Sequence, residues 1–85
     1  MEIILFDYSC IGWSKHREMN QMFLELQRRY FTDLLLNRGY VYLNEIYERL
    51  GAEWDPNKEN ICWHGRPIWI EFYPFAEYDF IIKIS

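Results

Sequence analysis

A long stretch without glycine or proline, from Lys15 to Arg38, most constrains the fold of this 85-residue chain. Glutamate, glutamine, leucine, methionine and arginine dominate the stretch, and these residues favour the helical conformation. The segment before it, Ser9–Ser14, contains Gly12 and indicates a turn, so Ser14 is expected to cap the helix N-terminus. We therefore predict one long helix, around which the rest of this short chain must pack.

The predicted helix carries two apolar ridges, which together cover more of its circumference than one sheet face would bury. The main ridge has the three-and-four spacing of a buried face and consists of Met19, Met22, Phe23, Leu26, Tyr30 and Leu34. The second ridge, about 100° further around the helix axis, consists of Leu24, Phe31 and Leu35. This second ridge is either covered by the N-terminal strand or by a second helix, or it is a surface for a partner or for self-association. An exposed Phe31 would favour the surface.

The stretch "RGYVYLNEIYERLGAEWD" contains signals that stop one helix and start another. Gly39 can adopt the left-handed conformation that ends a helix. The next residues, Tyr40–Leu43, are expected to be extended, and Asn44 is expected to cap a second helix over Glu45–Leu50. Gly51 ends that helix. The stretch thus turns the chain back towards a sheet.

Four segments rich in β-forming residues are predicted to be strands. They are Glu2–Tyr8, Ile61–His64, Ile68–Tyr73 and Tyr78–Ser85. The last three are expected to pair antiparallel, with the N-terminal strand beside them. We predict a single α+β domain over residues 1–85, in which the long amphipathic helix and the short helix pack on a small antiparallel sheet of three to four strands.

Alternation in the last two strands divides their side chains between two faces. Ile68, Ile70 and Phe72 would face the helix, as would Phe80, Ile82 and Ile84. The other face would carry Trp69, Tyr73 and Ile81 together with Glu71, Asp79 and Lys83. These apolar residues either form cross-strand pairs that stabilise the sheet, or anchor a protein partner, or stack nucleobases.

Other classes of site have little support in the sequence. The net charge of −4 disfavours binding along a phosphate backbone. The spacing of Cys10, His16, Cys62 and His64 matches neither a usual zinc site nor an activated thiol, so we expect no catalytic residue, metal, cofactor or small-molecule substrate. No membrane-spanning run or export signal is present, and a cytoplasmic protein with free thiols is expected.

Two segments resemble a family of short uncharacterised proteins encoded by phages and mobile elements of gut bacteria. The segments are "YFTDLLLNRGYVYLNEIYERLG" and "GRPIWIEFYPF", and the family pattern is an RGYVxLNExYxxLG core followed by a small sheet. The chain departs from this pattern at Ile61–Trp63, where the family has Leu-Gly-Trp. The family has no assigned activity, so the resemblance transfers no catalytic residues. It implies a context in which small acidic proteins bind other proteins, including host-defence inhibitors such as anti-CRISPR proteins.

The sequence therefore predicts a non-enzymatic protein-binding module. Its partner, or a second copy of itself, would contact either the sheet residues Trp69, Tyr73 and Ile81 or the helix residues Leu24, Phe31 and Leu35. The alternative is a small nucleic-acid-binding protein that uses the aromatic face of the sheet. An enzyme with a reactive Cys10 ranks third.

Overall fold

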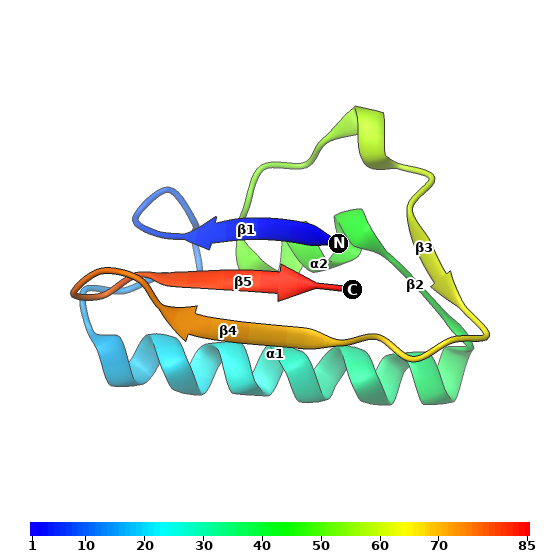
Figure 1. Ribbon diagram of the computed structural model, residues 1–85, viewed down its shortest axis with the longest axis horizontal. Coiled ribbons are helices and arrows are strands. Elements are labelled where there is room, and N and C mark those ends of the chain that lie inside the picture. Colours follow the sequence, from blue (N-terminus) through cyan, green and yellow to red (C-terminus); the bar gives the residue numbers. More distant parts are fainter.

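A computed structural model describes residues 1–85 and confirms the α+β prediction (Figure 1). The elements in chain order are β1 (Glu2–Phe6), α1 (Arg17–Arg38), β2 (Tyr40–Tyr42), α2 (Leu43–Leu50), the 3-10 turn η1 (Pro56–Lys58), β3 (Cys62–His64), β4 (Ile70–Pro74) and β5 (Phe80–Ile84).

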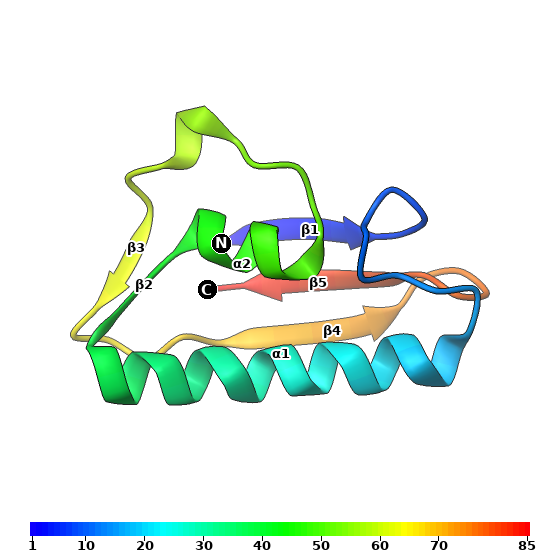
Figure 2. The ribbon, with the colours of Figure 1, turned by 180° about the vertical axis from the view of Figure 1, so that it is seen from behind.

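The main sheet has three antiparallel strands in the order β1-β5-β4, so the last strand of the chain lies in the middle. Both helices lie on one side of this sheet, as the views from front and back show (Figures 1 and 2). The core fills the space between them. For example, the rings of Phe6 on β1 and Phe23 on α1 stack with their centroids 5.6 Å apart. The predicted alternation is confirmed, since Ile70, Phe80 and Ile82 point into this core.

The strand β3 forms as predicted but does not join the main sheet. It pairs with β2 in a separate two-stranded sheet, with Val41 opposite Trp63. Both of these side chains are buried. The expectation that this strand pairs with β4 is therefore wrong, because β2 is itself a strand whose backbone needs a partner and whose Val41 completes the core with Trp63.

The expected burial of the main ridge of α1 is wrong for most of its residues, whereas the alternative in which the second ridge is covered is confirmed. Leu24 and Phe31 of the second ridge are 2% and 1% exposed. Most of the main ridge instead faces solvent, including Met19, Met22, Leu26 and Tyr30, while Phe23 and Leu34 are half-buried.

Two buried polar residues explain this orientation of α1. The amide of Asn20 donates to the backbone oxygens of Ser14 and Tyr78, both at 2.8 Å, and its oxygen accepts the Ser14 N–H at 2.8 Å. About two turns further along, Gln27 accepts a hydrogen bond from Arg49 at 2.7 Å. Both residues lie on the same face as Leu24 and Phe31. These hydrogen bonds, which a count of apolar residues leaves out, favour burial of that face.

The helix starts also differ from the predictions. The N-cap of α1 is His16, and Ser14 bonds to Asn20 instead. The N-cap of α2 is Tyr42, whose N–H is bound by the Glu45 carboxylate, whereas Asn44 lies inside the helix.

Candidate functional site

The outer face of the main sheet, on the side away from the helices, carries a group of exposed and half-buried apolar side chains. We call this group the outer face, and its members are Ile3, Leu5, Trp69, Tyr73 and Ile81. Strand register brings them together, because Leu5, Ile81 and Tyr73 lie in one row across β1, β5 and β4. No element of the fold covers this row (Figure 1). A single-layer sheet therefore presents a largely apolar surface to solvent.

Trp69 lies just before β4 but belongs to the same face. Its N–H donates to the backbone oxygen of Ser85 at 2.8 Å, and its own oxygen accepts the Ser85 N–H at 2.9 Å. This pair extends the β4–β5 ladder by one residue, so that Trp69 shares a face with Glu71 and Tyr73. The indole is 62% exposed.

A polar row lies beside these residues. Lys83 on β5 is opposite Ile3 on one side and Glu71 on the other. Its ammonium lies 5.5 Å from the centre of the Tyr73 ring, and the Tyr73 hydroxyl donates a hydrogen bond to the Glu71 carboxylate. That hydrogen bond raises the pKa of Tyr73 above its usual value. The charges of Lys83 and Glu71 balance, so the outer face has no strong net charge of its own.

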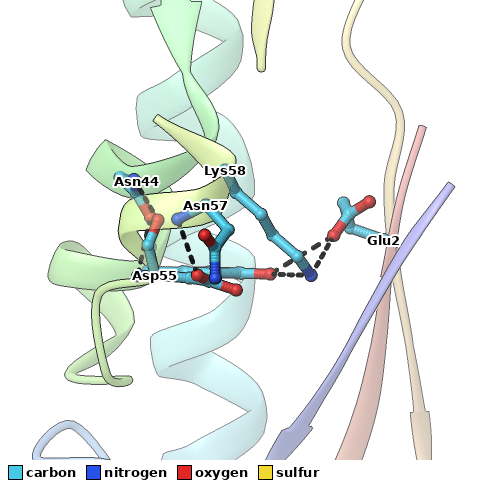
Figure 3. A network of polar contacts seen from close by, with 6 residues as sticks. Glu2, Asn44, Asp55, Asn57 and Lys58 are labelled. Carbon is cyan, nitrogen blue, oxygen red and sulfur yellow. Dashed lines mark hydrogen bonds and ion pairs between the residues drawn. The ribbon is translucent and has the colours of Figure 1, made fainter. Parts of the chain in front are cut away.

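The outer face continues around the free edge of β1 into a shallow groove. Its walls are β1 and the segment after α2, with Ile3, Leu5, Tyr47 and Trp54 among the lining residues. A polar network holds that segment in place (Figure 3). Lys58 of η1 donates to the Glu2 carboxylate at 2.7 Å, and this contact raises the pKa of the Lys58 ammonium above its usual value.

The same segment is tied to α2 by a buried side chain. The Asn44 amide donates to the backbone oxygen of Asp55 at 2.9 Å and accepts the Asp55 N–H at 3.2 Å. Asp55 in turn starts η1 by accepting the N–H of Asn57 at 2.9 Å. The wall of the groove is thus fixed from both sides (Figure 3).

The predicted site residues divide into two groups. Trp69 and Tyr73 are exposed on the outer face, and Ile81 is half-buried between them and Leu5. The helix residues do not form a surface. Leu24 and Phe31 are buried and Leu35 is half-buried against the core, so the assignment of these three to a partner-binding site is wrong for the folded chain.

Sequence reasoning missed Ile3 and Leu5, which complete the outer face. The signal that could have found them is the unbroken apolar run in "EIILF". In a sheet covered on one side only, a strand with four consecutive apolar residues, Ile3–Phe6, must expose half of them. It also missed the exposed helix residues Met19, Met22, Leu26 and Leu36, which we call the helix stripe.

The two thiols hydrogen-bond to backbone oxygens and not to a histidine. Cys10 is buried, and burial raises the pKa of its thiol above the ordinary value. Its Sγ lies 3.7 Å from the backbone oxygen of Leu5. The thiolate fraction at neutral pH is therefore small, which makes Cys10 a poor nucleophile. Cys10 and Cys62 are both free, and no three histidine, cysteine or acidic side chains come together as a metal site would need.

A protein-family model described as "Family of unknown function (DUF6353)" matches residues 2–80. The chain belongs to this family. The DUF6353 match contains four of the five outer-face residues and ends before Ile81. No curated protein and no solved structure matches the chain. Neither helix of this DUF6353 member is long and apolar enough to cross a membrane.

Proposed function

We propose that this DUF6353 member is a non-enzymatic protein-binding module and that its outer face contacts the partner. The observation that supports this most directly is the exposure of Trp69 and Tyr73 beside Ile3, Leu5 and Ile81 on an uncovered sheet. Tryptophan and tyrosine are the residues that most often anchor protein interfaces. A sheet presents them in fixed positions, so little conformational entropy is lost on binding.

Cross-strand stabilisation accounts for only part of this surface. The row of Leu5, Ile81 and Tyr73 consists of neighbours across the strands, which stabilise one another in the folded monomer. Trp69 is different. Its cross-strand neighbour is Ser85, whose small side chain offers the indole almost no contact area. An exposed tryptophan without an apolar cross-strand neighbour favours a role in binding.

The partner that we propose is a folded protein with an apolar surface patch. The resemblance to proteins of phages and mobile elements supports a sharper proposal, in which the partner belongs to a host-defence system of a bacterial cytoplasm and the chain inhibits it. The mixed charges of the outer face are consistent with an apolar contact. They give little support to mimicry of nucleic acid, which requires a strongly acidic surface.

Capture from a bacterial lysate on the immobilised full chain tests the proposal. The wild-type chain is compared with Trp69→Ala and Tyr73→Ala, and with Tyr8→Ala as the matched control. Tyr8 lies in the turn after β1 and is even more exposed than Tyr73. We expect a protein that is retained by the wild type and by Tyr8→Ala and lost with both outer-face variants. The affinity of the purified partner for each variant is then measured by calorimetry.

The circular dichroism spectrum and urea midpoint of each variant show whether it is folded. A captured protein that binds the outer-face variants as tightly as the wild type would contradict the proposal. So would unfolding of both variants, because Trp69 and Tyr73 would then be part of the structural core.

Binding of nucleic acid through the aromatic sheet face is the alternative from a different class. Lys83 is the single lysine or arginine on the three strands of the main sheet, and it lies opposite Glu71. Titration with fluorescent single-stranded RNA and DNA at low salt distinguishes the two functions. Binding that weakens as salt rises would favour nucleic acid, because phosphate contacts release counterions. If the chain binds proteins only, the fluorescence anisotropy of the labelled RNA and DNA should not change.

A further inference from the structure

The helix stripe has the spacing of a helix-pairing surface. Met19, Met22, Leu26 and Leu36 follow one another with Arg29 and Asp33 between them, so the intervals along α1 are three, four, three, four and three residues. This is the heptad spacing at which two helices interlock. The side chains are available, since Met22 is 64% and Leu36 79% exposed. The stripe lies on α1 away from Leu24 and Phe31, which pack on the core.

We propose that a second copy of this chain pairs its α1 with this one through the helix stripe, with the two helices antiparallel. In a parallel pair, each stripe residue would meet its own counterpart, so that Arg29 would face Arg29 and Asp33 would face Asp33. Like charges in such positions destabilise a helix pair. The antiparallel arrangement moves the two Asp33 residues about 16 Å apart along the helix axes, and each Arg29 no longer faces its own counterpart. It places Met19 opposite Leu36 at both ends and Leu26 opposite Arg29 on either side of the two-fold axis.

The charges at the centre of α1 favour this second copy. Glu25 and Arg29 make no ion pair or side-chain hydrogen bond within their own chain. The neighbouring Arg28 is occupied, since its guanidinium lies 4.9 Å from the centre of the Phe72 ring. Glu25 precedes Leu26 by one residue, so in the antiparallel pair it lies beside Arg29 of the second copy. The two-fold symmetry of the dimer produces two such charge pairs, one on each side of the axis.

The geometry also predicts a weak dimer. A helix of 22 residues is about 33 Å long, and one of its faces contributes less than the roughly 800 Å² per partner of a standard interface. Moreover, Asp33 of one copy lies opposite Met22 of the other, so a charged side chain faces an apolar one in that layer of the seam. Replacing Asp33 with leucine would make that layer apolar at two places in the dimer. The outer face of the main sheet lies on the opposite side from the helices, so it remains accessible in both copies (Figures 1 and 2).

Sedimentation equilibrium of the full chain from micromolar to millimolar concentration tests the proposal. We expect a monomer on dilution and a dimer at high concentration. Met22→Glu places a carboxylate opposite Asp33 of the other copy at two places in the seam and should abolish the dimer. Asp33→Leu should raise the association constant by about tenfold or more. The matched control is Gln21→Glu, which introduces the same group at an exposed position of α1 outside the stripe and should change nothing.

Disulfide trapping determines the orientation. In a Cys62→Ser background, a mixture of Met19→Cys and Leu36→Cys chains should form the mixed disulfide and neither homodimer, because position 19 of one copy lies opposite position 36 of the other. The native Cys10 is buried and does not compete for the disulfide. Homodimers linked through position 19 would show a parallel pair and overturn the proposed arrangement. The whole proposal is wrong if the wild type and Asp33→Leu remain monomers at every concentration, or if Met22→Glu dimerises like the wild type.

Discussion

The carboxylate of Glu45 joins two elements through two hydrogen bonds. It accepts the backbone N–H of Tyr42 at 2.8 Å, which caps α2, and a guanidinium N–H of Arg38 at 2.6 Å, which ties α2 to the end of α1. Burial alone would raise the pKa of Glu45, but these two bonds and the charge of Arg38 together lower it below the usual value. The folded state therefore prefers ionised Glu45.

Stability should depend on pH through Glu45. Because its folded pKa is lowered, its contribution is fully present above the unfolded carboxyl pKa of about 4.3 and is lost as the pH falls through the folded pKa. At neutral pH we expect Glu45→Ala to lower the free energy of unfolding by about 1 kcal/mol. Glu45→Gln should lower it less, since glutamine still accepts the Tyr42 N–H. Urea unfolding at neutral pH and at about pH 3 measures both effects. Equal losses at the two pH values would contradict this account.

The two thiols should differ in their reaction with alkylating reagents. Cys10 is 3% exposed and has a raised pKa, whereas Cys62 is half-buried at the end of the β2–β3 ladder. We expect the native protein to be modified first at Cys62, and Cys10 to react only when the chain opens. Mass spectrometry of the digested protein after short exposure gives the order. Equal rates in the native protein would show that Cys10 is accessible, and equal rates in urea serve as the control.

The elements of the fold could be predicted from the sequence to the extent that local signals determine them. Gly39 and Gly51 both end helices as expected, with φ angles of 89° and 76°. The buried face of α1 could not be predicted in this way. It depends on Asn20 and Gln27, which bond to residues far away in the chain, Tyr78 and Arg49. A pattern of apolar residues contains no information about such partners. The pattern therefore predicted burial for Met19, Met22 and Leu26 of the helix stripe, which are exposed.

The two helix-ending glycines should respond differently to alanine. Both have left-handed backbone conformations, which cost an alanine about 1 to 2 kcal/mol. A Cβ on Gly39 would meet nothing within 4 Å, whereas a Cβ on Gly51 would lie 2.4 Å from the backbone nitrogen of Ile11. Ile11 also donates its N–H to the Gly51 oxygen at 3.1 Å. In urea unfolding, Gly51→Ala should thus lose clearly more stability than Gly39→Ala. Similar losses would mean that the Ile11 segment moves aside at little cost.

At the scale of the whole molecule, the candidate site exists because this 85-residue chain builds only two layers, the sheet and the helices. Two helices cover one side of the sheet and nothing covers the other (Figures 1 and 2). The alternation in β4 and β5 predicted Trp69 and Tyr73 correctly as outward-facing residues. It could not predict that β1 lies at the sheet edge, because that depends on pairing between the two ends of the chain, Phe6 with Phe80 and Glu2 with Ile84.

The long segment between α2 and β3 is attached to the rest of the molecule at two places of different strength. Asn44 is 5% exposed and satisfies both backbone groups of Asp55. Truncating a buried side chain with two such bonds leaves polar groups without partners, which costs about 1 to 3 kcal/mol. Lys58 pairs with Glu2 near the surface, where 37% of its side chain is exposed. Such exposed ion pairs contribute about 0 to 1 kcal/mol.

We therefore expect Asn44→Ala to lower the free energy of unfolding more than Lys58→Met, although both residues hold the same segment. Hydrogen exchange should separate them further. The Asp55 N–H, which Asn44 binds, should exchange much faster in Asn44→Ala and be nearly unchanged in Lys58→Met. If Lys58→Met has the larger effect on both measurements, the ion pair between the chain's first strand and η1 holds this segment, and the buried amide of Asn44 has the minor role.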